Sequence, residues 1–182
     1  MKDFNWKEFK PTLLFLAKFV GLYIVANMVY GLFITAYVPV ADPVTHAVTE
    51  QCGWILDVTG WPVTVQDDAL KSTTLIVHEG MARIAVYEGC NGVNVMIIFL
   101  SFLLAFGPYT RAMAWFAPLG VMVIHAGNLA RIVLLFLVTL YYPNYLYYLH
   151  KYFFTAIIYV VVFILWIIWV RKFSGQQHAG DR

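Results

Sequence analysis

The stretch from Glu88 to Phe106 reads EGCNGVNVMIIFLSFLLAF and joins a short polar turn to a long apolar run. The turn holds a reactive side chain, Cys90, and no charged residue follows it between Asn91 and Phe106. Such an uncharged apolar run is typical of a helix that crosses a membrane. We therefore expect Cys90 to lie at the mouth of a transmembrane helix.

The composition of the whole chain agrees with a membrane protein. Of its 182 residues, 62% are hydrophobic and 12% are charged, whereas soluble domains average about 25% charged residues. The composition predicts an all-α integral membrane protein, a helical bundle of about four or more transmembrane spans. A net charge of +2 without a basic run gives no reason to expect nucleic acid. We expect one membrane-embedded domain over residues 1–174 and a disordered tail over 175–182.

Four segments are apolar enough to span a membrane. They are Pro11 to about Val38, Asn91–Phe106, Ala112–Tyr142 and Tyr152–Val170. The third exceeds the ~20 residues that one upright span requires. Either it tilts steeply, or its helix ends near Arg131 and residues 132–142 form a separate element.

The basic residues predict the orientation of these spans. Six of the twelve fall on one side of a four-span arrangement: Lys2, Lys7, Lys10, Arg111, Arg171 and Lys172. The positive-inside rule makes that side cytoplasmic. The opposite side then carries most of the acidic residues and Lys71, Arg83 and Lys151.

The outer segment, about residues 39–88, is the only substantial part expected outside the membrane. Residues 43–59 are typical of a helix that lies in the membrane interface, and Gly60-Trp61-Pro62 ends it. Two β-prone runs surround Glu79-Gly80 and predict a hairpin that leads the chain to Cys90. These runs are Thr73–His78 and Ala82–Tyr87.

This topology places Cys90, Arg131 and His150 at one membrane depth on the outer side. A charge inside a membrane costs several kcal/mol unless it is paired, so Arg131 marks a functional site. A neighbouring arginine lowers the pKa of a thiol and favours the nucleophilic thiolate. A histidine can carry the proton during acyl transfer, and an arginine can stabilise an oxyanion. The three residues predict a cysteine acyl-transfer site.

Three further residues could support these groups. Asn91 and Gly92 form a turn with a close-approach position, where amide groups could face an oxyanion. Asn128 could orient the arginine or satisfy the backbone. His125 is a rival base, but it lies roughly 9 Å deeper than Arg131 along the same helix.

Structural alternatives remain open for each catalytic candidate. Cys90 could form a disulfide with Cys52, because both are expected on the outer side. Arg131 could snorkel to the headgroups, and His150 could be an interfacial anchor. The histidines show no metal-ligand spacing, and we expect neither a metal nor a cofactor.

These pieces resemble the exosortase/archaeosortase family of multi-pass membrane transpeptidases. The matching motifs are Glu88-Gly-Cys90-Asn-Gly92 before a span, Asn128-Leu-Ala-Arg131-Ile132-Val, and His150 before a Trp-rich helix. The resemblance covers roughly residues 75–170 and looks closest to the short exosortase H subtype. It implies that Cys90, Arg131 and His150 are the catalytic set.

The resemblance also implies a substrate and a location. Substrates would be exported proteins with a C-terminal sorting signal, which comprises a short motif, a transmembrane helix and a basic tail. The enzyme would cleave at the motif and transfer the protein to an unknown lipid or glycan acceptor. It would lie in a bacterial inner membrane with its active site on the periplasmic face. The residues alone leave two other classes open: a membrane thiol–disulfide protein that uses Cys52 and Cys90, and a non-enzymatic scaffold or transporter.

Overall fold

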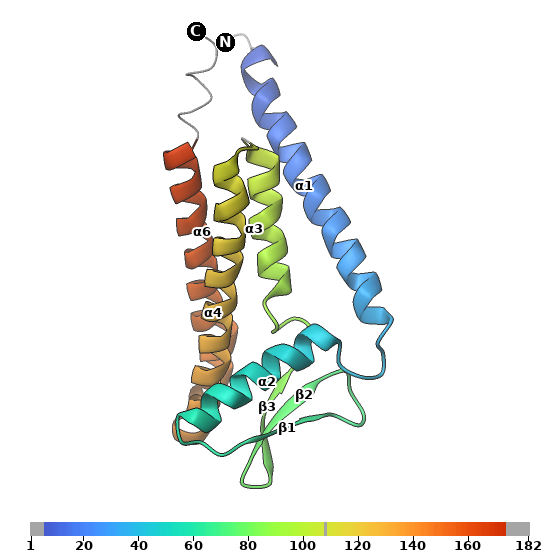
Figure 1. Cartoon of the computed structure of the whole chain (residues 1–182), viewed down its shortest axis with the longest axis vertical. Coiled ribbons are helices and arrows are strands. Elements are labelled where there is room, and N and C mark those ends of the chain that lie inside the picture. Colours follow the sequence, from blue (N-terminus) through green and yellow to red (C-terminus); the bar gives the residue numbers. More distant parts are fainter. Residues whose placement is uncertain (1–5, 108, 174–182) are drawn as a thin grey trace.

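The computed structural model describes residues 6–107 and 109–173 and consists of a helical bundle with a small outer layer at one end (Figure 1). The predicted tail at 175–182 lies outside the described residues. The bundle contains α1 (Trp6–Thr35), α3 (Val93–Phe106), α4 (Arg111–Tyr141) and α6 (Phe154–Phe173). The outer layer contains α2 (Pro43–Val58), β1 (Thr64–Asp67), β2 (Thr74–His78) and β3 (Met81–Val86).

Among the described residues, three helical segments are long and apolar enough to cross a membrane, and α3 is a shorter apolar helix. The three are Phe9–Thr35, Arg111–Tyr141 and Pro143–Lys172. The prediction of an all-α integral membrane protein is confirmed, with the small outer sheet as its β component. The last span begins earlier than predicted, because a short 3-10 turn, α5 (Leu146–Tyr148) and a π-helical turn (Leu149–Phe153) precede α6.

The long apolar stretch forms one continuous helix, α4, of 31 residues. Such a helix is ~46 Å long, whereas the hydrocarbon core is ~30 Å thick. Arg131 follows Arg111 by a helical rise of ~30 Å, which equals the thickness of that core. The remainder of α4 extends beyond it and packs into the outer layer, where Ile132 and Phe136 are buried. The alternative of a break near Arg131 is therefore wrong.

The outer layer is one helix across a three-stranded antiparallel sheet, in the order β1-β2-β3. The predicted helix over 43–59 and the predicted hairpin are both confirmed. The Asp42 carboxylate accepts hydrogen bonds from the backbone N–H groups of Val44 and Thr45, which caps α2. One face of α2, including Cys52 and Leu56, is buried in a cluster shared with the sheet and α4. Strand β1, the third strand, was not predicted.

The membrane half of the bundle packs through aromatic side chains. Phe102 of α3 stacks on Trp166 of α6, with ring centroids 4.3 Å apart. The buried Trp169 donates a hydrogen bond from its indole N–H to the carbonyl of Gly107, at 2.8 Å. Gly120 of α4 allows the Phe99 ring to approach, since a Cβ there would lie 2.2 Å from it. These contacts fix α3, α4 and α6 against one another.

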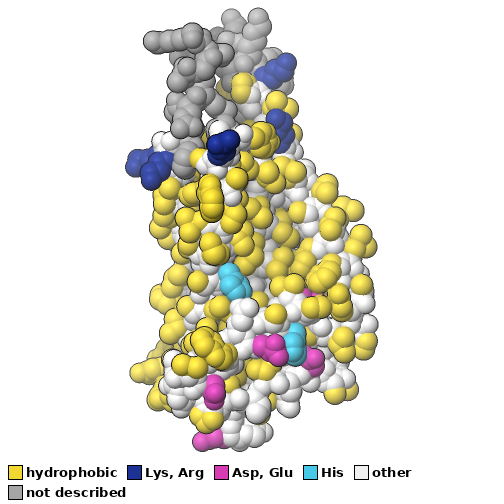
Figure 2. Space-filling model, viewed as in Figure 1, with side chains coloured by type: hydrophobic (Ala, Val, Ile, Leu, Met, Phe, Trp, Pro, Cys, Tyr) yellow, Lys and Arg dark blue, Asp and Glu magenta, His cyan; other side chains and the backbone are white. Residues whose placement is uncertain are grey.

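Charged side chains divide between the two ends of the molecule. Figure 2 shows lysine and arginine side chains at one end and acidic side chains toward the other. The start of α1 and the end of α6 lie at the same end as the basic residues (Figure 1). This arrangement agrees with the basic side that the sequence predicts.

Candidate functional site

Cys90 lies in the tight turn that connects β3 to α3. Its backbone N–H donates to the carbonyl of Tyr87, at 2.7 Å. Gly92 follows in the left-handed region, with φ +88°, where side chains are strained. A Cβ on Gly92 would also lie 3.1 Å from Cγ of Asn128. Glycine therefore allows both the direction of the turn and its close approach to α4.

Asn91 anchors this turn to two other elements. Its side chain is fully buried, and its amide nitrogen donates to the hydroxyl oxygens of Tyr30 in α1 and Thr45 in α2, at 2.7 and 2.9 Å. Its carbonyl oxygen accepts from the N–H of Val93, the first residue of α3, at 3.0 Å. The side chain of Asn91 therefore holds the turn in place and starts the helix.

Asn128 holds the turn from α4. Its buried amide donates to the carbonyl of Cys90, at 2.9 Å. Of its two predicted roles, the geometry matches satisfaction of the backbone. The carbonyl of a cysteine in a buried turn would otherwise lack a partner, which costs ~1–3 kcal/mol.

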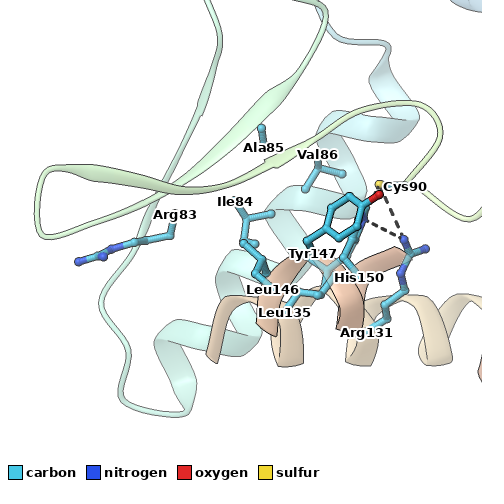
Figure 3. Close-up of a pocket in the computed structure, with 11 residues that line it drawn as sticks. Arg83, Ile84, Ala85, Val86, Cys90, Arg131, Leu135, Leu146, Tyr147 and His150 are labelled. Atoms are coloured by element: carbon cyan, nitrogen blue, oxygen red, sulfur yellow. Dashed lines mark hydrogen bonds between the residues drawn. The ribbon is translucent and has the colours of Figure 1, made fainter. Parts of the chain in front are cut away.

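The structure brings Cys90, Arg131 and His150 together, as Figure 3 shows. Cys90 Sγ lies 3.6 Å from His150 Nε2 and 3.9 Å from Arg131 Nη2. Arg131 Nη2 lies 3.2 Å from His150 Nε2. Since a guanidinium only donates, this last contact requires an unprotonated Nε2 that accepts. The same Nε2 is the imidazole nitrogen that contacts the thiol.

His150 comes from the π-helical turn Leu149–Phe153. π-Turns are rare and occur frequently at functional sites. The carbonyl of His150 accepts a hydrogen bond from the Thr155 hydroxyl, at 3.1 Å. His150 is therefore held by a local distortion of the last helical segment.

The Cys90 thiol does not have the lowered pKa that we expected from its neighbours. Cys90 is 6% exposed, and this burial raises its pKa, although Arg131 and the Tyr87 hydroxyl oppose the change. Burial dominates because it penalises the charged form of the thiol. The expectation of a lowered pKa is therefore wrong, and a nearby base that removes the proton would activate the sulfur.

Tyr87 is a neighbour of the thiol that the sequence did not indicate. Its side chain lowers the pKa of Cys90 and so opposes the effect of burial. Its ring lies close against Gly89, where a Cβ would come within 2.4 Å of it. The turn geometry brings residues 87 and 90 together, and proximity in the sequence was the only available signal.

Cys52 takes no part in this site. Both cysteines are free, so the predicted alternative of a Cys52–Cys90 disulfide is not formed. Cys52 is fully buried in α2, and burial raises its pKa to about 12. It is a core residue.

The rival base, His125, also lies elsewhere. Its Nε2 contacts the Gln51 side-chain oxygen of α2, at 2.7 Å. Within residues 6–107 and 109–173, no group of three or more His, Cys, Asp or Glu side chains could hold a metal ion.

Comparison with known proteins identifies the family. The family model for transmembrane exosortase (Exosortase_EpsH) matches residues 9–170, which includes all the residues of the site. Searches of curated proteins and of solved structures return no match. The family match supports a membrane transpeptidase of the exosortase type, in agreement with the multi-pass helical fold. The chain therefore belongs to the transmembrane exosortase family.

Proposed function

We propose that this protein is a cysteine transpeptidase that cleaves C-terminal sorting signals of exported proteins and transfers the new C-terminus to a cell-surface acceptor. The observation that carries the proposal is the contact of Cys90 Sγ with His150 Nε2, at 3.6 Å, beside Arg131. A thiol within reach of a base that is itself oriented by a third group is the arrangement of an activated nucleophile.

The first step forms a thioester. His150 takes the thiol proton, the sulfur of Cys90 attacks the scissile carbonyl, and a tetrahedral oxyanion forms. The C–N bond then breaks, and His150 gives its proton to the leaving amine. One histidine therefore serves as base and then as acid, and no external proton is required.

Arg131 is placed to stabilise the oxyanion. Its Nε is buried and has no hydrogen-bond partner among the described residues. Its Nη2 lies 3.9 Å from Cys90 Sγ, and a guanidinium in that place can stabilise the negative charge that develops on the attacked carbonyl oxygen. We assign Arg131 this role and expect its contact with His150 to keep the imidazole unprotonated before attack.

The second step resolves the thioester. An amine, a hydroxyl group or water attacks the acyl carbon, His150 accepts its proton, and the thiol of Cys90 leaves with a proton. A lipid or glycan nucleophile gives transfer, and water gives hydrolysis. Asn91, Gly92 and Asn128 act as supporting residues, because they hold the turn that carries Cys90.

The membrane setting fits a substrate with a transmembrane tail. We place the protein in a bacterial inner membrane with the basic end in the cytoplasm, according to the positive-inside rule. The outer layer and the site then face the periplasm. A tailed substrate diffuses laterally and presents its scissile bond near the outer boundary of the membrane, where Arg131 lies.

The test is processing of a tailed protein from the same host by matched cysteine variants. Cys90→Ala should abolish cleavage while the protein remains folded and inserted. Cys52→Ala should process normally, because Cys52 is fully buried and lines neither of the cavities beside the thiol. Normal cleavage by a stably inserted Cys90→Ala variant would contradict the proposed function.

A further inference from the structure

Two cavities meet at the candidate site. We call the first the outer cavity, of about 360 Å³, whose walls include Ile84, Val86, Ile132, Leu135 and Leu146. The second, the membrane-side cavity, is about 460 Å³ and includes Asn94, Val95, Thr155, Ile158 and Tyr159. Both cavities share Arg131, Tyr147 and His150. Cys90 lines the outer cavity, and the shared residues His150 and Arg131 both contact its sulfur. A chain that passes the thiol can therefore occupy one cavity on each side of these shared residues.

The directions of the helices define the depth of each cavity. Helix α4 runs from the basic end toward the outer layer, so Ile132 and Leu135 lie farther out than Arg131. Strand β3, which supplies Ile84 and Val86, belongs to the outer layer. The outer cavity therefore lies on the side of the site away from the membrane; Figure 3 labels residues that line it.

The membrane-side cavity lies in the opposite direction. Helices α3 and α6 both run from the site toward the basic end of the bundle. Asn94 and Val95 are in the first turn of α3, and Ile158 follows His150 by two helical turns. Three chain directions therefore give the same order of depth: outer cavity, thiol, membrane-side cavity.

We propose, on the basis of the proposed function, that the substrate binds in one direction across these cavities. The residues before the scissile bond occupy the outer cavity, and the residues after it occupy the membrane-side cavity. The transmembrane helix of a tailed substrate follows the scissile bond, so only this direction lets that helix continue into the bilayer. The reverse direction would require the helix to turn back at the site.

The walls of the outer cavity define its occupant. Its side chains are mainly aliphatic, with Arg83 at the far end from Cys90. Strand β3 is an edge strand of the described sheet, and edge strands present unpaired backbone groups that can pair with an extended chain. We assign to this cavity a short extended segment with an aliphatic side chain directly before the scissile bond.

The membrane-side cavity has a different role in the two steps. It holds the leaving segment during acylation, and it empties when the amine leaves with its transmembrane helix. The acyl segment remains in the outer cavity as a thioester on Cys90. The attacking amine, hydroxyl group or water then enters through the vacated cavity, which has polar groups at Asn94, Lys151 and Thr155.

The test uses acyl thioesters, which need no knowledge of the natural motif. The probes are N-acetyl-leucine and N-acetyl-alanine thioesters, each with a long alkyl thiol or a short hydrophilic thiol as leaving group. The rate of Cys90 acylation is followed by mass spectrometry on the full-length protein. We expect the parent to prefer leucine to alanine and the alkyl leaving group to the hydrophilic one.

Tryptophan substitutions that fill each cavity separate the two preferences. Leu146→Trp should lower the leucine-to-alanine preference by about 10-fold and keep the preference for the alkyl thiol. Thr155→Trp should lower the preference for the alkyl thiol and keep the leucine-to-alanine preference. Leu134→Trp and Ile157→Trp are matched controls, because both side chains are exposed and line neither cavity. If Leu146→Trp does not fold, Ile84→Phe fills the same cavity.

The outcomes distinguish the direction of binding from the proposed function. If Leu146→Trp lowered the preference for the alkyl thiol and Thr155→Trp lowered the leucine-to-alanine preference, the substrate would bind in the reverse direction and the proposal would be wrong. Unchanged preferences in both filled variants, with Cys90 still acylated, would also overturn it. Failure of every thioester to acylate Cys90 in the folded parent would instead contradict the proposed function.

Discussion

Replacement of Arg131 by lysine keeps the positive charge and removes the planar set of donors. In the structure, one terminal nitrogen lies 3.2 Å from His150 Nε2 and 3.9 Å from Cys90 Sγ. The Nε of the same guanidinium is buried without a partner among the described residues. A lysine ammonium is a point charge and cannot reproduce these separate donors. Arg131→Lys therefore tests whether geometry or charge matters at this position.

The expected loss follows from the donors that lysine lacks. If the ammonium keeps one contact, to His150 or to the sulfur, the oxyanion loses at least one donor. Removal of one oxyanion donor in other enzymes reduces kcat by about 10²–10³-fold, or about 2.7–4 kcal/mol. We expect a fall in kcat of this size for Arg131→Lys. KM should change little, because the lost interaction forms mainly in the transition state.

The assay is single-turnover cleavage of a tailed substrate by purified protein in lipid vesicles. Leu134→Lys, at an exposed position on the same helix, controls for the insertion of an additional lysine. A lysine variant at position 131 with parental kcat would refute the reasoning, because a point charge would then be sufficient. A loss confined to KM would assign Arg131 to substrate binding instead.

Three further predictions concern the thiol, the turn and the topology. Because burial raises the pKa of Cys90 and Arg131 opposes this change, Arg131→Ala should raise that pKa further and shift the pH profile of Cys90 alkylation to higher pH; a shift to lower pH would contradict it. Asn128→Ala should reduce the free energy of unfolding by about 1–3 kcal/mol, since it leaves the Cys90 carbonyl unpaired, and an unchanged unfolding midpoint in denaturant would exclude that role. In a background without native cysteines, an impermeant thiol reagent applied to intact cells should label Lys71→Cys but not Tyr109→Cys, and the opposite pattern would invert the protein.

Residues far apart in the sequence could be assigned to one site because membranes order the chain by depth. The uncharged run after Cys90 indicated the membrane depth of the thiol. The single charge of Arg131 within an apolar stretch indicated the depth of the guanidinium. The alternation of spans then placed His150 on the same side. The family match over residues 9–170 confirms the resemblance that these motifs indicate. The contacts among the three side chains agree with that placement.

Other features depend on tertiary contacts that no local pattern encodes. The short strand β1 forms only by pairing with β2, so its residues carried no distinct signal. The role of Asn91 requires that Tyr30 and Thr45 meet it from two other helices. The pKa of Cys90 depended on the balance between burial and charge, and the neighbouring arginine alone indicated the wrong direction.

The length of the apolar stretch alone also could not predict that α4 is one continuous helix. A stretch longer than one span can tilt, break or extend out of the membrane. Here the helix continues without a break, and the outer layer covers its apolar extension and buries Ile132 and Phe136. The same extension forms one wall of the outer cavity through Leu135.

The most direct test of the central claim is detection of a thioester on Cys90 during cleavage of a tailed substrate. The reaction is stopped in acid, and the peptide that contains Cys90 is analysed by mass spectrometry. The account predicts the N-terminal part of the substrate on this peptide, its release by hydroxylamine as a C-terminal hydroxamate, and no adduct on Cys52. Cleavage that proceeds at the full rate with Cys90 unmodified at every time point, and with no hydroxamate formed, would contradict the account.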